Sequence, residues 1–385
     1  MLQIDTREDC CGCTACAMIC AKHAITMIPD KMGFMYPRVN KDLCINCGLC
    51  LNVCTFNMNY DVTENLEIPK VYATRHKDIK EVLSSQSGGM FIAISDFILS
   101  NDGAIYGVGF DEQFRIIHKR TTSKEGRDEF KGSKYVQSDL SDIFFRIKND
   151  LKNNQTVLFS GTPCQTSGLK SYLNLTQTDT QHLYLCDIIC HGVPSPNIWE
   201  DYISYIKKIS RKDIKKINFR NKEFGWKSYV ETYILSNGKQ IIRDTFVNLF
   251  VKNIMLRPSC GNCKYANLKR PSDITLGDFW GWWKYSQEFM DDLGISLTIV
   301  NTPKGELLFN KIRPFVNSIE SNTVHCLQRN LQNPTQLSEA RTAFEHDYKN
   351  HGFMYVAKKY KALGWHSTYR ALRRLLKQIL KKWKK

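Results

Sequence analysis

Residues 10–20, CCGCTACAMIC, and residues 44–54, CINCGLCLNVC, repeat one cysteine rhythm that decides the fold of the N-terminal part. Each block has the spacing Cys-x2-Cys-x2-Cys-x3-Cys, the bacterial ferredoxin spacing, in which the fourth cysteine ligates the cluster of the other block. The spacing predicts two [4Fe–4S] clusters in one small ferredoxin-like module. The first expected ligand set is Cys10, Cys13, Cys16 and Cys54, and the second is Cys44, Cys47, Cys50 and Cys20.

Two other uses of these cysteines are less consistent with the sequence. Tandem zinc sites more usually show Cys-x2-Cys pairs separated by a longer loop. A disulfide framework needs an oxidising compartment, and the N-terminus shows no basic segment followed by an apolar core. The fifteen cysteines therefore indicate metal ligation and a cytoplasmic location. Cys11 does not fit the spacing and is expected to pack beside a cluster, and Cys186 and Cys326 are expected in the core or at the surface.

Composition and charge place limits on the function. The chain has 385 residues, of which 42% are hydrophobic and 24% charged, which is globular composition and enough for two or three domains. No run of eighteen apolar residues predicts a membrane span. The last acidic residue is Asp347, and the segment beyond it holds twelve Lys and Arg of a net +16, which leaves +4 for the first 347 residues. Nucleic acid is therefore not an expected partner.

The body of the chain alternates short apolar strands with helices. Hydrophobic runs predict strands over 71–75, 104–110, 115–120, 156–160 and 183–189, and helices over 90–99 and 140–151. We expect an α+β fold, with an N-terminal two-cluster ferredoxin-like module, an α/β body with a mixed sheet and a C-terminal basic helix. The turn Ser87-Gly88-Gly89 before the helix at 90 is typical of an N-cap, and its backbone N–H groups also suit a phosphate or a carbonyl-rich ring.

Four further cysteines stand at turns beside small residues. Two of them follow buried strands, at the end where open α/β sheets place ligands. The other two form a Cys-x2-Cys pair in a loop. Four thiolates suit either a [4Fe–4S] cluster or a structural zinc. Spacing alone decides neither whether the four cysteines share one site nor which metal that site would hold. The four residues are Cys164, Cys190, Cys260 and Cys263.

Several motifs together resemble the family of coenzyme F-420 hydrogenase and dehydrogenase beta subunits. With the ferredoxin module, they cover residues 1 to about 320 in the order of that family. The segments are Gln86-Ser87-Gly88-Gly89, Gly132-Ser133-Lys134-Tyr135, Gly161-Thr162-Pro163-Cys164-Gln165, Cys190-His191-Gly192-Val193-Pro194-Ser195-Pro196, and Cys260-x2-Cys263 through Gly277-Asp278-Phe279-Trp280-Gly281.

The resemblance implies a third [4Fe–4S] cluster on the four dispersed cysteines, beside a flavin that we expect to be FAD. It implies flavin contacts from Ser87, Gly88 and Gly89, with Lys134 and Gln137 as further candidates. His191, next to Cys190, is the candidate proton donor near the flavin, and the alternative is a histidine that only hydrogen-bonds the cluster loop.

Clusters pass single electrons, and a flavin accepts single electrons and delivers a pair as hydride. We therefore expect a flavin-dependent iron–sulfur oxidoreductase that takes electrons from a low-potential donor such as ferredoxin. By family analogy, a saccharide or another small molecule of surface polysaccharide biosynthesis is the expected substrate. The alternatives are a non-catalytic electron-transfer subunit and a zinc-stabilised interaction protein carrying a ferredoxin.

The C-terminal tail predicts an amphipathic basic helix from Tyr369 to Lys385. Such a helix suits an anionic membrane surface on the cytoplasmic side, and the alternatives are docking of an acidic donor and packing on the body. The apolar residues of its stripe are Leu372, Leu375, Leu376, Ile379, Leu380 and Trp383. The expected domains are 1–60 (ferredoxin type), 70–150 (like the N-terminal domain of the beta subunits), 151–330 (like the C-terminal domain of the beta subunits, with flavin and iron–sulfur) and 348–385 (basic tail).

Overall fold

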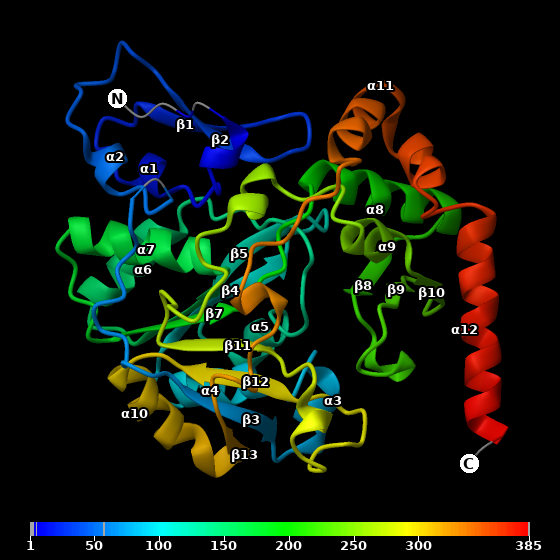
Figure 1. Ribbon diagram of the computed structural model, residues 1–385. Coiled ribbons are helices and arrows are strands. Elements are labelled where there is room, and N and C mark those ends of the chain that lie inside the picture. The colour runs from blue at the N-terminus through cyan, green and yellow to red at the C-terminus, as the bar shows by residue number, and fades with distance from the viewer. Residues whose placement is uncertain (1–3, 5, 57, 384–385) are drawn as a thin grey trace.

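The structure is a computed structural model that describes residue 4, residues 6–56 and residues 58–383, without the side chains of residues 374, 375 and 377–383. A ferredoxin-like N-terminal segment lies at one end of a central sheet, a smaller sheet with helices lies beside it, and a long C-terminal helix runs along one edge (Figure 1). The expected α+β class with a mixed sheet and a C-terminal helix is confirmed.

The two cysteine blocks of the N-terminal module share one local conformation. Helix α1 (Ala15–Met18) begins after Thr14 at a φ of 65°, and α2 (Leu49–Asn52) begins after Gly48 at a φ of 78°. A left-handed residue reverses the chain direction sharply, so each block curls around a small volume. The other elements of the module are a 3-10 turn, η1 (Arg7–Asp9), and an antiparallel hairpin, β1 (Ile25–Pro29) with β2 (Met35–Val39).

The central sheet has eight strands in the order β13-β3-β12-β11-β7-β6-β4-β5. In the middle of the sheet, β11, β7, β6 and β4 pair with one another in parallel. The pairings on either side of these four strands are antiparallel. The parallel strands place their carboxyl ends at one edge of the sheet. The bounds are β3 (Lys70–His76), β4 (Ala104–Phe110), β5 (Ile116–Thr121), β6 (Val157–Gly161), β7 (Leu183–Ile188), β11 (Ile274–Asp278), β12 (Ser296–Val300) and β13 (Val316–Ser321).

Helices cover both faces of this sheet, because successive residues of the central strands point to opposite faces and almost all of them are buried. Phe159 on β6 packs toward α6 and α7, while its neighbour Leu158 packs toward α4 and α10. The ferredoxin-like module joins the first of these layers, because Ala15 and Ile19 belong to the same hydrophobic cluster as Phe159. The helices of the two layers are α6 (Ile143–Lys152) and α7 (Pro163–Leu175) on one side, and α4 (Met90–Ser100) and α10 (Pro303–Ile312) on the other.

A hydroxyl residue followed by proline starts two of the helices that matter for the site. Thr162 and Gln165 form a capping box at the start of α7, with Pro163 as its first residue. Ser195 accepts a hydrogen bond from the Ile198 N–H at the start of α8 (Pro196–Ser210). Proline supplies the φ of a first helical residue, so the motifs quoted from the sequence fix where α7 and α8 begin. Cys164 thereby sits in the first turn of α7.

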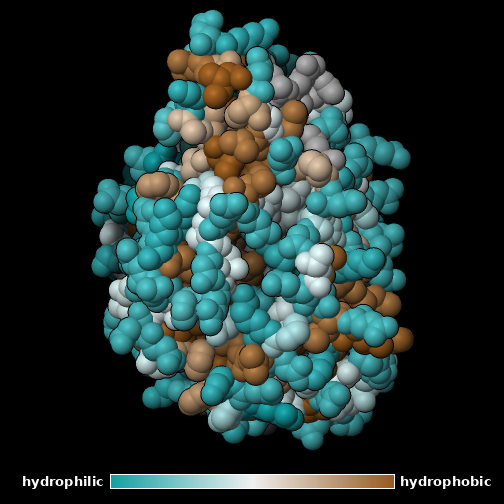
Figure 2. Space-filling view, turned by 90° about the vertical axis from the view of Figure 1, so that its left-hand side faces the viewer, coloured by the Kyte–Doolittle hydropathy of each residue, from teal (hydrophilic) through white to brown (hydrophobic). Residues whose placement is uncertain are grey.

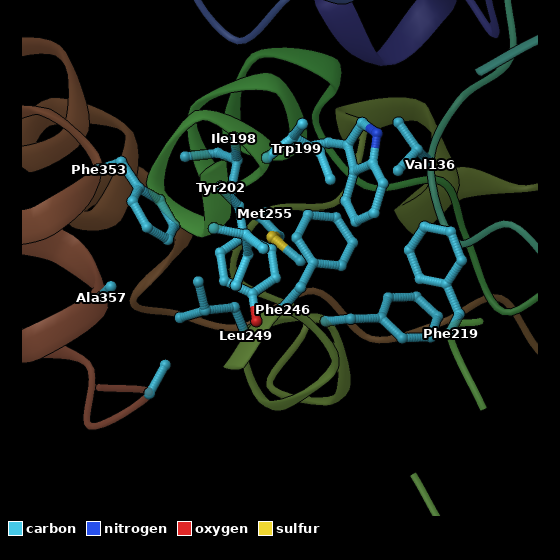
Figure 3. Close-up of a cluster of buried hydrophobic side chains, with 14 of the residues drawn as sticks. Val136, Ile198, Trp199, Tyr202, Phe219, Phe246, Leu249, Met255, Phe353 and Ala357 are labelled. Atoms are coloured by element: carbon cyan, nitrogen blue, oxygen red, sulfur yellow. The ribbon is translucent and has the colours of Figure 1, made fainter. Parts of the chain in front are cut away.

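A second core lies under the three-stranded sheet β10-β9-β8. Figure 3 shows its centre, where Trp199 and Tyr202 of α8 meet Phe246 and Phe353. This core also receives Phe34 from the N-terminal module. The elements are β8 (Ile214–Asn218), β9 (Glu231–Leu235), β10 (Gln240–Arg243), α9 (Thr245–Val251) and α11 (Arg341–Lys359). The remaining short elements are α3 (Ile79–Ser84), α5 (Lys124–Asp128), η2 (Lys222–Phe224), η3 (Pro258–Asn262), η4 (Trp282–Lys284), η5 (Arg313–Phe315) and η6 (Arg329–Leu331).

The C-terminal helix α12 (Trp365–Trp383) is attached to the body near its start. Arg370 forms a two-point ion pair with Asp244, at 2.8 and 3.1 Å. Two expected stripe residues, Leu372 and Leu376, are exposed rather than packed on the body. The side chains of the other stripe residues, Leu375, Ile379, Leu380 and Trp383, lie outside the described part. Within the described residues, no helix combines the length and apolarity needed to cross a membrane.

Candidate functional site

The first expected cluster set surrounds a small cavity in the N-terminal module. Cys10, Cys13 and Cys16 of the first block and Cys54 of the second line this cavity together. Burial raises the pKa of the Cys10 and Cys16 thiols, and each of the two also responds to the charges of Cys13 and Cys54. The structure thus brings a cysteine of the second block to the first, as the exchanged spacing predicts.

The second set lies toward the surface of the module. Cys50 is in α2, Cys44 and Cys47 lie in the loop before it, and Cys20 follows α1. Cys47 is exposed and the other three are half-buried. A backbone N–H, that of Ala24, donates to the Cys20 sulfur at 3.3 Å. Membership of Cys20 in this set stays a prediction.

The four dispersed cysteines converge at the carboxyl ends of β6 and β7. Burial raises the pKa of the Cys190 thiol, and the charges of Cys260, Cys164 and Cys263 raise it further. Burial also raises the pKa of Cys260 to about 12 and that of Cys263 to about 11. A hydrogen bond with Cys11 lowers the pKa of Cys164 to about 7. Each of Cys190, Cys260 and Cys263 responds to the charge of Cys164, so the four thiols form one group, which we call the inner cysteine set.

Backbone contacts hold the two loops of the inner cysteine set side by side. The Arg257 N–H donates to the Val193 carbonyl at 2.9 Å, and the Val193 N–H donates to the Cys260 sulfur at 3.5 Å. A buried ion pair adds to these contacts, because Arg270 lies 3.1 Å from Asp187. Arg270 also donates to the Ile188 carbonyl at 3.0 Å, two residues before Cys190. These contacts fix Cys190 against Cys260.

The spacing of these cysteines bears on the choice of metal. Zinc draws four thiolates to about 2.3 Å from one point, whereas a cubane holds its four thiolates around a larger body. Among the described residues, no three His, Cys, Asp or Glu side chains are grouped closely enough for a single metal ion. Four thiolates suit either group, so the [4Fe–4S] cluster on this set stays a prediction.

A cavity of about 770 Å³ opens beside the inner cysteine set, at the carboxyl ends of β4, β6, β7 and β11. A ligand pocket of this size holds a cofactor or a drug-sized molecule. The expected site residues that line it are Ser87, Gly89, Lys134, Cys190 and His191. The cavity therefore brings the Ser-Gly-Gly turn together with the segment that carries Cys190.

Two expected flavin contacts lie elsewhere. Gly88 is outside the cavity wall, and its N–H donates to the Ser296 hydroxyl at 2.9 Å. A Cβ at Gly88 would come within 2.3 Å of the Thr74 carbonyl, so glycine is required there for close strand approach. Gln137 donates to the Cys11 carbonyl at 3.0 Å and accepts from Arg257 at 2.8 Å. Gln137 therefore lies beside the N-terminal module.

Gly89 and Lys134 have structural partners in addition to their place in the cavity wall. Gly89 is the N-cap residue of α4, at a φ of 85°. The Lys134 ammonium donates to the Glu129 and Lys131 carbonyls at 2.7 and 3.0 Å. Burial lowers the pKa of Lys134 to about 7. A small change in its surroundings therefore changes its charge near neutral pH.

His191 is held by two side-chain amides. Its Nε2 lies 2.7 Å from the Asn253 oxygen and its Nδ1 lies 3.4 Å from the Asn330 oxygen. The Asn253 nitrogen donates to the Gln336 carbonyl, which leaves the oxygen to accept from the imidazole. The ring is thus anchored by loops while it lines the cavity, so both expected roles of His191 stay open.

An arginine–aspartate pair on the cavity wall was not predicted. Arg220 is buried and lies 2.7 Å from Asp278, which also accepts from the Trp226 indole at 2.8 Å. The Arg220 Nε has no hydrogen-bond partner among the described residues. Asp278 belongs to a quoted motif, but its partner lies 58 residues earlier in a segment without a recognisable pattern.

The cavity also carries polar atoms that lack partners. The Ser85 hydroxyl and the Gln86 side-chain nitrogen are buried, belong to residues that line the cavity, and have no hydrogen-bond partner in the part of the chain that the structure describes. Buried polar groups are normally paired, so these atoms indicate a polar ligand. Arg329 on the cavity wall adds positive charge that suits phosphates, and Lys131 and Arg220 are further cations there that pair with carboxylates. The residues present therefore fit a nucleotide-bearing flavin such as FAD.

Comparisons with known proteins agree with the expected resemblance. Residues 154–317 match the family model of the C-terminal part of the coenzyme F420 hydrogenase/dehydrogenase beta subunit, and residues 9–58 match the 4Fe-4S dicluster domain. No curated protein matches the chain. A chain of the F420-reducing [NiFe] hydrogenase complex from Methanosarcina barkeri is similar, with a TM-score of 0.46 and 14% identity over 78% of this chain and 94% of that chain.

Proposed function

We propose that this chain, a member of the coenzyme F420 hydrogenase/dehydrogenase beta subunit family with an N-terminal 4Fe-4S dicluster domain, is an iron–sulfur flavoprotein oxidoreductase. Its family and dicluster domain give it an electron-transfer role of the oxidoreductase type. The observation that carries the finer proposal is that Cys190 lines the same cavity as the Ser87 turn. A cluster on the inner cysteine set would then border whatever occupies the cavity.

The proposed ligand sets follow the sequence. Each holds one [4Fe–4S] cluster through four thiolates. Mutual electrostatic influence supports the first and third sets, and the spacing supports the second. The sets are Cys10, Cys13, Cys16 and Cys54; Cys20, Cys44, Cys47 and Cys50; and Cys164, Cys190, Cys260 and Cys263.

FAD is the proposed occupant of the cavity, where it would supply conversion between single-electron and hydride transfer. The chain's own residues bind and orient it: Ser87 and Gly89 form one wall, and the orphaned Ser85 and Gln86 groups supply hydrogen bonds. The Arg220 guanidinium offers a free N–H to an anionic or carbonyl oxygen. His191, anchored by Asn253, would hold a proton at the cavity edge.

The proposed electron donor is a low-potential protein such as ferredoxin. Cys47 is exposed, and apolar side chains around it are also exposed, at Leu43, Ile45 and Leu51. The space-filling view shows apolar side chains gathered at the end of the molecule formed by the N-terminal module (Figure 2). An exposed cluster ligand in an apolar surface suits contact with an electron carrier.

The proposed substrate is a saccharide or a related small molecule of surface polysaccharide biosynthesis. Trp280 and Tyr229 line the cavity next to Asp278. Aromatic side chains near a carboxylate suit a polyhydroxylated ring, which has apolar C–H faces and hydroxyl edges. The proposed location is the cytoplasm, with the tail at the inner membrane surface. The domain bounds 1–60, 70–150, 151–330 and 348–385 remain proposals.

Anaerobic purification followed by quantification of iron, acid-labile sulfide, zinc and flavin tests the proposal. Three cubanes predict about twelve iron per chain, together with one FAD. Cys260→Ser should lower the iron content to about eight, since one cluster loses a ligand. Cys326→Ser is the matched control, because Cys326 is also buried but lies outside the proposed sets. About eight iron with zinc and no flavin in the unmodified protein would instead identify a non-catalytic electron carrier.

A further inference from the structure

Arg257 is a buried cation with no carboxylate partner among the described residues. It is 0% exposed, and among the described residues its guanidinium donates only to neutral groups. The partners are the Cys10 carbonyl at 2.7 Å, the Gln137 amide oxygen at 2.8 Å and the Met35 carbonyl at 2.9 Å. The ring of Tyr36 lies 4.3 Å from the guanidinium carbon. These contacts satisfy its N–H groups and leave its charge without a counter-charge.

Other buried arginines of this chain have a carboxylate partner. Arg127 lies 2.8 Å from Asp96, Arg220 lies 2.7 Å from Asp278, and Arg270 lies 3.1 Å from Asp187. Burying an ionised group without a nearby opposite charge costs several kcal/mol. Arg257 therefore needs a nearby negative charge, and no carboxylate among the described residues supplies it.

Arg257 lies between the two cysteine groups. Its side chain reaches the first block, where a Cβ on Gly12 would stand 2.7 Å from its Nη1. Its backbone belongs to the loop of the inner cysteine set, because the Cys260 N–H donates to the Arg257 carbonyl at 3.0 Å. One residue thus contacts the loops of both proposed clusters.

We propose that Arg257 is a positioning residue whose counter-charge is the pair of thiolate-ligated clusters on either side of it, and that its positive charge raises the reduction potential of both. This inference rests on the proposed ligand sets. Reduction adds negative charge to a cluster, so a buried cation nearby favours the reduced state. Because the same cation acts on both clusters, it makes both easier to reduce.

The test is a redox titration of the anaerobically purified full chain, followed by electron paramagnetic resonance. In Arg257→Gln, two of the three clusters should shift to more negative potential, by at least a tenfold change in the reduced-to-oxidised ratio, which is about 59 mV for one electron. The cluster of Cys44, Cys47 and Cys50 should not shift and serves as an internal reference. Arg257→Lys keeps the charge and should restore the potentials.

Two further variants keep the inference testable if the Arg257→Gln protein does not assemble its clusters. Gln137→Glu places a carboxylate beside the guanidinium without removing it, and should lower the same two potentials. Arg341→Gln is the structural control, since Arg341 donates to the Leu256 carbonyl at 2.8 Å on the same segment but pairs with Glu345. It should leave all potentials unchanged.

The outcomes separate the inference from the proposed function. Unmodified protein that holds about twelve iron, with potentials that are unchanged in both Arg257→Gln and Gln137→Glu, would overturn the role of Arg257 alone. Equal shifts in Arg257→Lys and Arg257→Gln would assign Arg257 a hydrogen-bonding role only, and would also overturn it. Unmodified protein without iron would overturn the proposed function and the inference together.

Discussion

The hydroxyl groups of Thr55 and Tyr265 lie 3.0 Å apart in the interior and join the N-terminal module to the loop of the inner cysteine set. Thr55 follows the last cysteine of the second block, and Tyr265 follows Cys263 by two residues. Tyr265 also packs with Cys11 and Phe56 in one small cluster. This contact therefore ties the segments that carry the two proposed clusters to each other.

Tyr265→Phe should loosen the module on the body. A lost buried hydrogen bond costs about 1 kcal/mol, which is roughly a fivefold change in an opening equilibrium. The measurement is the rate of limited proteolysis in the connecting segment 58–69, which should rise about fivefold. Thr55→Val should have a similar effect, and the double variant should be no worse than either single variant. Tyr369→Phe, on the exposed face of α12, is the control, and additive effects at 55 and 265 would rule out the coupling.

Electron entry is expected at the exposed second cysteine set. Ile45 is 63% exposed beside Cys44, so Ile45→Glu places a charge in the proposed docking surface without disturbing a core. Loss of about 1.4 kcal/mol of docking energy would lower the rate of reduction by ferredoxin about tenfold. The measurement is stopped-flow reduction at constant ionic strength.

Leu307→Glu is the matched control for that substitution. Leu307 is 67% exposed on α10, which lies at the far end of the molecule from the N-terminal module (Figure 1). Reduction by small-molecule dithionite should be equal in both variants. A similar loss with ferredoxin in both variants would place donor docking elsewhere.

Local patterns made much of the fold predictable. The strand over 104–110 and the helix over 90–99 were predicted almost to the residue, as β4 (Ala104–Phe110) and α4 (Met90–Ser100). Their apolar runs and turns are continuous in sequence, so short-range preferences decide them. The sheet order was not predictable, because β3 inserts between β12 and β13, more than 200 residues later.

The cysteine spacing predicts the first ligand set, and the structure gathers its four cysteines around one cavity, although their role as ligands stays a prediction. The surroundings of that set were not predictable. Cys11 was expected to pack beside a cluster, and it is buried between Cys13 and Cys164, but its hydrogen bonds toward both thiols were not predicted. Gln137 was expected at a flavin and lies against Arg257. Arg257 follows Leu256 in an ordinary apolar segment, and only the folded chain shows that no described carboxylate approaches it.

Glu231 predicts a pH dependence of stability. It is buried under Tyr202, Tyr233 and the Val247 N–H, and burial raises its pKa from 4.5 to about 7. The folded chain therefore binds this proton more tightly than the unfolded chain does. Its contribution to stability is full below pH 4.5 and is lost as the pH rises through 7.

Glu231→Gln should remove that slope, since glutamine does not titrate. The difference in free energy of unfolding between pH 5.5 and pH 8 should shrink by on the order of 2 kcal/mol relative to the unmodified chain, as measured by urea unfolding. Glu125→Gln on the surface is the control and should leave the slope unchanged. An unchanged slope in Glu231→Gln would mean that Glu231 stays ionised in the folded state.

The exposed leucines of α12 predict binding to an anionic membrane surface. Leu372 is 56% and Leu376 is 60% exposed, and Arg370 holds the start of the helix against Asp244. Full-length protein should therefore float with vesicles rich in anionic lipid, and less so at high salt, since screening weakens attraction of the basic face. Replacing both leucines with glutamine keeps the charge and should reduce flotation strongly, and a chain ending at Gly364 should not float. Equal flotation of the full-length protein, the leucine variant and the shortened chain would exclude the tail as the membrane contact. Salt-sensitive flotation that the leucine replacements do not change would assign membrane binding to charge alone.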